Sequence, residues 1–515
     1  MDIKKKLRIG FIHPDLGIGG AERLVVDAAV ALQRRGHEVV MFTSRHDPKR
    51  CFPETTDGTL TVHVLGSFLP RSLHPRLPLT IVFSILRALV LAFLLLFSLL
   101  LPGPPTFMNP LSPIEPFDIF FVDQQSVAIP LLRFVSGTRV VFYCHFPDKL
   151  LSGGWEINVD AQGQEGMGIV ERKKGSESVG LAKKLYRWPI DKLEEITTGQ
   201  SDVVLSNSEF TSRVYARAFP SLAKRSPRVV YPCIDVDSYQ PSAREGKGKA
   251  KLDDGVQLIS SARPTIISLN RFEAKKNVGL AIRAFAKLGS DGLVSDARFG
   301  ELRLVIGGGY DSEELDNKNT LSNLQDLCDE LSLTYHTIGK SESSTPPPAA
   351  VQVLFILNFS SAQRTHLLTS LNTRCLLYTP ANEHFGIVPI EAMSCGLPVL
   401  AADSGGPTET VLDLSTHKEG TGILRSPKAE EWAPALASLI DMSENDRNKV
   451  AEAAKGRVHD KFSLSKLGAD LEQACRDALV LGDLHTQLGD KLIWGGATLM
   501  ATSAIGLALI IWLSG

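Results

Sequence analysis

Two glutamates, Glu383 and Glu391, stand in the stretch NEHFGIVPIEAMSCGLPVLAADSGGPTETV at 382–411. We expect Glu383 on a loop, Glu391 about one turn into a helix, and a left-handed Gly396 before a buried strand. Carboxylates accept hydrogen bonds from hydroxyl groups, and free N–H groups at a helix N-terminus bind phosphate oxygens. The stretch therefore predicts a site for an anion joined to a polyol, in which Glu391 would hold a ribose and Glu383 a second sugar. The loop would also contribute Phe385, Gly386, Ile387 and Val388 to this site. The alternative is a pair of solvated or capping glutamates, which are common on such elements.

Two cations precede a predicted helix in the stretch TIISLNRFEAKKNVGLAIRAFAKL at 265–288. Arg271 and Lys276 lie on the turn between a strand and this helix, so both side chains can face one point. Together they would neutralise a diphosphate. The competing interpretation is a pair of solvent-facing cations on a surface turn.

A glycine-rich turn also follows the first predicted strand, Arg8–His13. Gly17, Gly19 and Gly20 precede an apolar helix and a second strand, which is the pattern of a βαβ unit. The glycine spacing is not Gly-x-Gly-x-x-Gly, and no acidic residue closes the second strand, so a nicotinamide site is disfavoured. We expect amides near Gly19 and Gly20 to approach a phosphate.

Polar side chains end two further predicted strands in the first half of the chain. Asp123 and Gln124 end one strand, and His145 stands at the carboxyl end of the next. Open parallel sheets bind their ligands at this edge. His145 and Asp123 are therefore candidates for the acceptor side of a site, although a lone histidine is more often structural.

The elements that must position these residues form two α/β halves. A chain of 515 residues exceeds one ordinary core, and 43% hydrophobic with 22% charged residues is a globular composition. The net charge of −2 gives no electrostatic reason to expect nucleic-acid binding. We expect an N-terminal domain over 1–240, a linker over 241–261, a donor-binding domain over 262–455, helices over 456–490 that cross back to the first domain, and a tail at 492–513. Residues 152–180 and 341–350 are expected to be a mobile loop and a surface insertion.

Two apolar stretches are long enough to meet a membrane. Residues 77–101 are interrupted mainly by Arg87, and residues 493–513 carry no charge, so either could cross about 30 Å of hydrocarbon. We expect 77–101 to span the membrane or lie in its interface, and the tail to be either a membrane helix or an apolar core helix.

Seven scattered cysteines without a Cys-x-x-Cys pair indicate reduced thiols rather than a zinc site. No Asp-x-Asp element stands among the predicted site residues, so any metal stimulation would be indirect.

The composite of Glu-x₇-Glu, Cys-Gly-Leu-Pro-Val and Gly-Gly-Pro-x-Glu at 383–409 resembles the donor site of retaining glycosyltransferases of the GT-B fold. The stretches YCHFPDKLL at 143–151, LYRWPIDKLEEITTGQSDVVLSNSEFT at 185–211 and NRFEAKKN at 270–277 are similar to the family of endoplasmic-reticulum α-1,3/1,6-mannosyltransferases of dolichol-linked oligosaccharide assembly, in glycosyltransferase family 4. The resemblance implies two Rossmann-like domains that face a cleft.

The resemblance also implies a reaction. GDP-mannose would donate mannose to Man₁GlcNAc₂-PP-dolichol, first by an α-1,3 and then by an α-1,6 linkage, with retention, at the cytosolic face of the endoplasmic-reticulum membrane. Arg271 and Lys276 would stabilise the departing diphosphate, Glu383 would orient the mannose, and His145 would position donor or acceptor. Loss of one such stabilising donor costs about 3–4 kcal/mol. The implied partners are the lipid-linked oligosaccharide, membrane lipid and other mannosyltransferases of the same pathway, without a tightly bound cofactor.

Two alternatives remain open at this point. One is a related enzyme with another lipid acceptor, such as a phosphatidylinositol N-acetylglucosaminyltransferase. The other is a non-enzymatic subunit that binds a nucleotide sugar. The joint presence of Arg271, Lys276, Glu383 and Glu391 argues against the second, because an idle site would not require all four.

Overall fold

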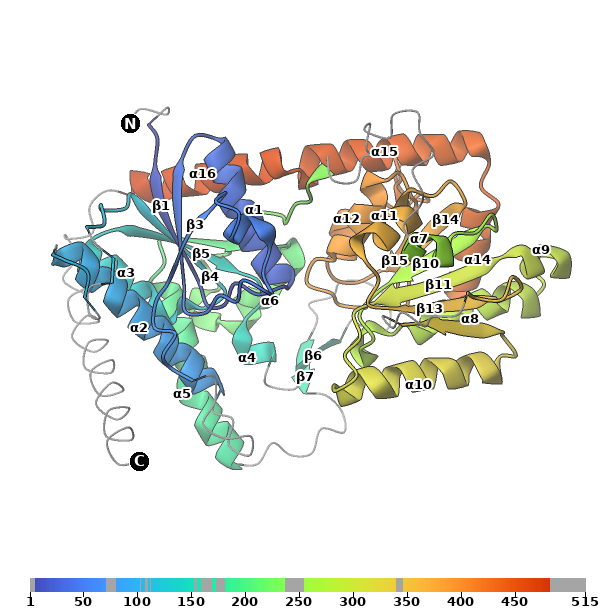
Figure 1. Ribbon diagram of the computed structural model, residues 1–515, viewed down its shortest axis with the longest axis horizontal. Helices are drawn as coiled ribbons and strands as arrows, with labels where there is room; N and C mark the ends of the chain where they lie inside the picture. Colours follow the sequence, from blue (N-terminus) through green and yellow to red (C-terminus); the bar gives the residue numbers. More distant parts are fainter. Residues whose placement is uncertain are drawn as a thin grey trace. The chain divides into compact units, whose positions relative to one another are not determined.

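The computed structural model divides into two compact units. Unit 1 comprises Met1–Glu156, Val170–Cys233 and Leu464–Gly515, and unit 2 comprises Ile157–Ile169 and Ile234–Ser463. The structure describes residues 5–481 except 71–79, 102, 107–109, 112, 152–154, 159–168, 173–180, 237–253 and 340–345. Each unit contains its own parallel sheet and its own hydrophobic core (Figure 1).

Unit 1 is built on a seven-stranded parallel sheet with the order β3-β2-β1-β4-β5-β8-β9. The strands are β1 (Arg8–His13), β2 (Glu38–Thr43), β3 (Thr61–Val64), β4 (Ile119–Asp123), β5 (Arg139–Cys144), β8 (Val203–Ser206) and β9 (Arg228–Val229). The central strands are buried along nearly their whole length, as expected of short apolar runs covered on both faces. The order reverses between β1 and β4, which is where such sheets bind ligands.

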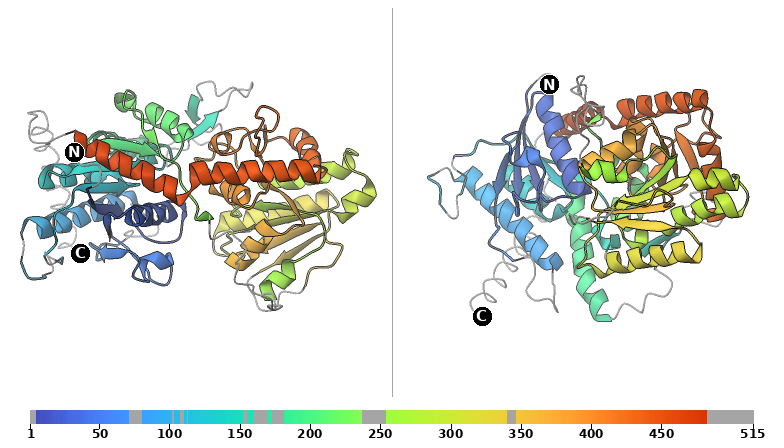
Figure 2. Two further views of the ribbon diagram at one scale, coloured as in Figure 1. Left: turned by 90° about the horizontal axis from the view of Figure 1, so that it is seen from above. Right: turned by 45° about the vertical axis from the view of Figure 1, so that its right-hand side comes forward.

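Helices cover both faces of this sheet. They are α1 (Gly20–Arg34), α2 (Thr80–Leu100), α3 (Ile129–Ser136), α4 (Asp148–Leu151), α5 (Leu181–Gly199), α6 (Glu209–Ala218) and α16 (Leu464–Val480). Figures 1 and 2 show α1 and α16 side by side, and their apolar residues join the same core cluster. The last described helix of the chain is therefore part of the first unit. The described helix α2 packs against α3 in the same unit.

Unit 2 repeats the arrangement with the strand order β12-β13-β11-β10-β14-β15-β16, again with parallel pairing. The strands are β10 (Thr265–Leu269), β11 (Arg303–Gly308), β12 (Tyr335–Ile338), β13 (Val353–Leu357), β14 (Thr373–Tyr378), β15 (Val399–Ala402) and β16 (Gly422–Arg425). The helices are α7 (Asp254–Ile259), α8 (Gly279–Ser290), α9 (Asp296–Glu301), α10 (Leu315–Glu330), α11 (Ser361–Thr369), α12 (Ile387–Ser394), α13 (Pro407–Thr410), α14 (Ala429–Ile440) and α15 (Glu444–Phe462). The order changes direction at β10, whose neighbours are β11 and β14.

The predicted glycine stop after α12 is confirmed. Gly396 has a φ of 78°, and its N–H and that of Leu397 donate to the carbonyls of Met393 and Ala392. A left-handed residue satisfies the last carbonyls of a helix without the steric cost that a Cβ would bring.

The apolar stretch at 77–101 contains α2, which among the described residues is the helix long and apolar enough to cross a membrane. One third of its most apolar segment is buried inside the protein, including Leu91, Ala92 and Leu95. Gln125 donates a hydrogen bond to Ser84 of this helix over 3.2 Å. The helix is therefore integrated in unit 1 along one face. The second apolar stretch, 493–513, lies outside the described residues.

The expected loop at 152–180 contains regular structure instead. Its segments β6 (Trp155–Asn158) and β7 (Ile169–Arg172) form a two-stranded sheet. WEIN alternates apolar and polar residues as a strand does, and IVER begins with two β-branched residues. The polar residues around both segments outweighed this signal in the prediction. The rest of this loop, at 152–154, 159–168 and 173–180, and residues 341–345 of the second insertion lie outside the described residues.

Candidate active site

Lys276 and Glu383 form an ion pair at the carboxyl edge of the unit 2 sheet. Lys276 ends the 3₁₀ turn Ala274–Lys276 after β10, and Glu383 lies on the loop after the neighbouring strand β14. The Nζ–Oε2 distance is 2.5 Å. The hydroxyl of Thr379 donates to the carbonyl of Lys276 over 2.7 Å and so ties the two loops together. The structure thus brings together two residues that the sequence assigned to one site.

The ion pair keeps Glu383 ionised. Burial acts to raise the pKa of this carboxyl, but the charge and hydrogen bond of Lys276 outweigh it and lower the pKa below its ordinary value. Burial, followed by the charge of Glu383, raises the pKa of the neighbouring Tyr378. Because Glu383 stays an anion and 23% of its side chain is exposed, it can accept a hydrogen bond from a sugar hydroxyl.

Arg271 is placed differently from Lys276, although the sequence grouped them. Its side chain is 70% exposed, and its Nη1 lies 3.1 Å from Oε1 of Glu273. Glu273 also pairs with Lys275 over 3.1 Å. The Glu273 side chain is only 11% exposed but keeps Lys275 as a partner, so the exposed Arg271 can turn toward an anionic ligand without leaving this carboxylate unpaired.

Gly405 and Gly406 of the SGGPTE segment at 404–409 allow two loops to pack backbone to backbone. Gly405 has a φ of 69°, and an added Cβ would lie 2.5 Å from the carbonyl oxygen of Glu383. A Cβ on Gly406 would lie 2.2 Å from the carbonyl oxygen of Phe385, and the Gly406 N–H donates to Glu383 over 2.7 Å. Gly405 and Gly406 therefore fix the backbone that carries Glu383.

Helix α12 begins directly after the loop that carries Glu383. Its N-cap is Gly386 with a φ of 86°, and no side chain caps its first turn. Its first residues are Ile387 and Val388, which were predicted to contribute to the anion site. The Phe385 side chain is buried and makes an edge-to-face contact with Phe462.

Glu391 is deeper in α12 than the sequence suggested. It is 4% exposed, and its carboxylate pairs with the guanidinium of Arg364 from α11. Sequence reasoning did not identify Arg364, which lies in a segment without a recognisable motif. A ribose at Glu391 would meet a carboxylate that already has a cationic partner.

In unit 1, the glycine loop leads directly into α1. Gly19 is the N-cap with an extended backbone, and α1 begins at Gly20, beside which an added Cβ would meet no atom. The carboxylate of Glu22 folds back, so that a Cβ on Gly19 would lie 2.2 Å from its Oε2. An acidic side chain at a helix N-terminus is favoured by the helix dipole, and a phosphate at this loop would have to displace it.

His145 and Asp123 both lie at the carboxyl edge of the unit 1 sheet, where the sequence placed them, and they contact each other and a third residue. His145 Nε2 lies 2.8 Å from Asp123 Oδ1, and Nδ1 of His13, the last residue of β1, lies 2.7 Å from Asp123 Oδ2. Burial acts to raise the pKa of Asp123, but the charge of His145 and the hydrogen bonds from both histidines lower it to about 2. The sequence analysis placed His13 at the end of a predicted strand and assigned it no role.

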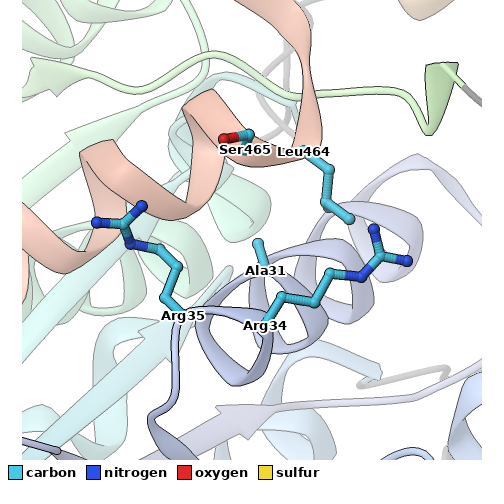
Figure 3. Close-up of a pocket in the computed structure, with 5 residues that line it drawn as sticks. All are labelled: Ala31, Arg34, Arg35, Leu464 and Ser465. Carbon is cyan, nitrogen blue, oxygen red and sulfur yellow. The ribbon is translucent and has the colours of Figure 1, made fainter.

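A pocket of about 470 Å³ lies elsewhere in unit 1. Ala31, Arg34, Arg35, Leu464 and Ser465 line it (Figure 3). Figure 3 shows the two guanidinium groups on opposite sides of the pocket, and Arg35 pairs with Glu472 over 2.5 Å. The pocket lies at the C-terminal end of α1, about 20 Å from the glycine loop by the rise of the helix. Cations in the last turn of a helix are expected from the helix dipole alone.

All seven cysteines carry free thiols, and five of them are buried. Within the described part of the chain, no group of three or more His, Cys, Asp or Glu residues is arranged to hold a metal ion.

Two family models match the chain. "Glycosyltransferase Family 4" matches residues 18–238, and "Glycosyl transferases group 1" matches residues 348–457. Among solved structures, sucrose-phosphate synthase from Thermosynechococcus elongatus superposes with a TM-score of 0.59 at 18% identity, covering 93% of this chain and 100% of that one. A glycosyltransferase from Rickettsia africae superposes with a TM-score of 0.59 at 16% identity, covering 92% and 99%. These likenesses confirm the predicted GT-B fold.

Curated relatives match over nearly the full length. The α-1,3/1,6-mannosyltransferase ALG2 of Rhizomucor pusillus is 40% identical over 510 residues, covering 99% of this chain and 98% of the relative. The protein of the same name from Neurospora crassa is 39% identical, covering 99% and 98%. That from Candida albicans is 39% identical, covering 90% and 97%. With two glycosyltransferase domains and such relatives, this chain belongs to the α-1,3/1,6-mannosyltransferase family of enzymes that use nucleotide-sugar donors.

Proposed function

We propose that this protein transfers mannose from GDP-mannose to Man₁GlcNAc₂-PP-dolichol and adds an α-1,3 and an α-1,6 mannose with retention. The product would be Man₃GlcNAc₂-PP-dolichol, a precursor of asparagine-linked glycans. The names of the full-length relatives support the two linkages. The observation that carries the assignment to unit 2 is the Lys276–Glu383 pair, in which one cation and one carboxylate stand 2.5 Å apart on adjoining loops.

In this proposal, Lys276 and Arg271 stabilise the departing diphosphate. Lys276 has three N–H donors, of which Glu383 occupies one, so it can bind a phosphate oxygen while it remains paired. Arg271 would turn from Glu273 toward the phosphates. The uncapped amides at the start of α12 and those near Gly19 and Gly20 would add further donors.

Glu383 would orient the mannose as a hydrogen-bond acceptor rather than as a proton donor. Its lowered pKa keeps it ionised, and the bound lysine reduces its strength as a nucleophile. We therefore propose that the acceptor hydroxyl attacks the donor from the face of the leaving group. The acceptor oxygen bonds to the anomeric carbon as the bond to the diphosphate breaks, and the hydroxyl proton passes to the departing phosphate.

We propose that Glu391 holds the ribose and that Arg364 sets the orientation of its carboxylate. The Arg364 side chain remains 30% exposed, so the pair is reachable from one side. A ribose hydroxyl would donate to a carboxylate oxygen that also pairs with the arginine.

The lipid-linked acceptor supports a membrane location. We propose that the protein works at the cytosolic face of the endoplasmic-reticulum membrane, with the exposed face of α2 in contact with lipid. Val82, Phe93 and Leu100 are exposed apolar residues of this helix. An exposed apolar face on a helix whose opposite face packs against unit 1 suits contact with lipid.

The test is transfer by detergent-purified protein, with GDP-mannose and synthetic Man-GlcNAc₂-PP-phytanyl as acceptor. Wild-type protein should add two mannoses, and Glu383→Ala and Lys276→Ala should abolish transfer. Lys449→Ala, at an exposed lysine of α15, is the matched control and should transfer normally. Absence of transfer by wild-type protein, together with transfer of N-acetylglucosamine to phosphatidylinositol, would favour the alternative acceptor instead.

A further inference from the structure

Three neighbouring strands of unit 1 end in polar side chains on the same face of the sheet. Side chains along a strand alternate between faces, so His13 shares its face with Ile9 and Phe11. Phe11 lies level with Phe121 in β4, and Phe121 lies level with Val141 in β5. The same alternation takes β4 from Phe121 to Asp123 and β5 from Tyr143 to His145. The ring contacts Phe11–Phe121, Phe121–Tyr143 and Tyr143–His145 follow this row across the sheet.

Asp123 determines which ring nitrogens carry hydrogen. Its carboxyl is ionised, since its pKa is lowered to about 2, and a carboxylate only accepts hydrogen bonds. The nitrogens that face it, His13 Nδ1 at 2.7 Å and His145 Nε2 at 2.8 Å, must therefore both be donors. A neutral imidazole carries one hydrogen, so a neutral His145 has an unprotonated Nδ1.

Burial separates the roles of the two histidines. His13 is 1% exposed, and its Nε2 is buried without a hydrogen-bond partner in the described part of the chain. The side chain of Asp123 has no exposed surface, and histidines hold both of its oxygens. The His145 side chain is 18% exposed, and Asn207 fixes its carbonyl through a 3.1 Å hydrogen bond. Of the three residues, His145 is the one that a substrate can reach.

We propose that His13 and Asp123 are positioning residues that hold the hydrogen of His145 on Nε2, so that Nδ1 accepts a hydrogen bond from a sugar hydroxyl during transfer. The inference rests on the proposed function, because it takes His145 to contact the substrate. It also changes the role assigned to Asp123, which acts through His145 instead of touching the acceptor. His13 fixes the second carboxylate oxygen and thereby the angle at which Asp123 meets His145.

Substitutions at His13 separate positioning from packing. His13→Leu keeps the bulk but removes the donor to Asp123, and we expect kcat to fall about 10- to 100-fold, the range typical for groups that orient a functional histidine. The KM for GDP-mannose should stay within about twofold of wild type, since Lys276 and Arg271, the cations proposed to hold the donor's phosphates, lie in unit 2. His13→Asn places an amide N–H near the position of Nδ1 and should restore most of kcat. His63→Leu, a partly buried histidine of β3 in the same sheet, is the matched control and should leave kcat within about twofold.

Asp123→Asn tests the same device with an isosteric change in case His13→Leu folds poorly. An amide offers one acceptor oxygen and one N–H group, so one histidine would face a donor and have to change tautomer. We expect a fall in kcat of about 10- to 100-fold, again with little change in the donor KM. A folded Asp123→Asn or His13→Leu variant with wild-type kcat would overturn the inference.

A spectroscopic readout tests the tautomer without activity. In protein labelled with ¹⁵N-histidine, the His145 signals are assigned by their loss in His145→Gln. Wild type should show hydrogen on Nε2 and none on Nδ1, and Asp123→Asn should alter this pattern. Hydrogen on Nδ1 of wild-type His145 at neutral pH would contradict the inference. If wild-type protein fails to transfer mannose, the proposed function fails, yet this spectrum still decides the tautomer.

Discussion

Each unit holds a carboxylate at the carboxyl edge of its sheet, and the two are stabilised in different ways. Asp123 in unit 1 is fully buried between two histidines, whereas Glu383 in unit 2 is 23% exposed and pairs with one lysine. Both carboxyls have a lowered pKa against the opposing effect of burial. A carboxylate enclosed on both oxygens can only position a neighbour, while one with exposed surface can bind a ligand directly. Burial therefore distinguishes the two roles where residue type does not.

The largest expected effect comes from removing the cation beside Glu383. Lys276→Met should lower kcat by about 100- to 1000-fold, because a lost donor to the departing diphosphate leaves its charge unstabilised. Lys276→Arg should retain more activity, since it keeps the charge but not the geometry. Steady-state transfer assays measure both. Equal activity of Lys276→Met and wild type would mean that the Lys276–Glu383 pair has only a structural role.

The two carboxylates should separate in their effect on stability. Asp123→Asn should reduce the free energy of local unfolding of unit 1 by about 3 kcal/mol, because the buried His13 and the partly buried His145 lose their anion. Glu383→Gln should cost less than about 1 kcal/mol, because its pair is partly solvated. Hydrogen exchange of peptides from β1, β4 and β5, compared with peptides from β10 and β14, measures the two units independently. Equal losses of stability in the two variants would contradict the proposed difference between the two carboxylates.

Acid should weaken unit 1 through Asp123. The folded pKa of about 2 lies below the ordinary 3.8, so the carboxylate stabilises the fold at higher pH and loses this contribution as pH falls from about 4 to about 2. The difference corresponds to about 2 kcal/mol. Hydrogen exchange in β4 at a series of pH values should show this loss in wild type and a flatter dependence in Asp123→Asn. The same pH dependence of hydrogen exchange in both proteins would exclude Asp123 as the source of the loss of stability.

The smallest effect should come from Arg271. Arg271→Ala removes a side chain that is 70% exposed, so stability should change by no more than about 0.5 kcal/mol. If Arg271 turns toward the diphosphate, the KM for GDP-mannose should rise about tenfold, which corresponds to about 1.4 kcal/mol. Thermal unfolding and donor titration provide the two measurements. An unchanged KM would leave Lys276 as the cation of the donor site.

Local chemistry in the sequence was enough to predict many elements. The first strand, Arg8–His13, has the predicted bounds, and Gly396 ends its helix in the left-handed conformation. The two glycines at 405–406 mark a turn because a side chain there would collide with the loop at 383–385. The strands at 155–158 and 169–172 were missed, since short segments among polar residues give a weak signal.

Residue types and short-range spacing were enough to predict the two parallel α/β halves, their glycine turns and the resemblance to a mannosyltransferase family. Which side chains meet depends on the tertiary structure. His13 reaches Asp123 across 110 positions of the chain, and Lys276 reaches Glu383 across 107. Both contacts require particular strands to be neighbours, as do the burial of Glu391 and its pairing with Arg364. Strand order follows from the packing of the whole sheet, which no local pattern contains.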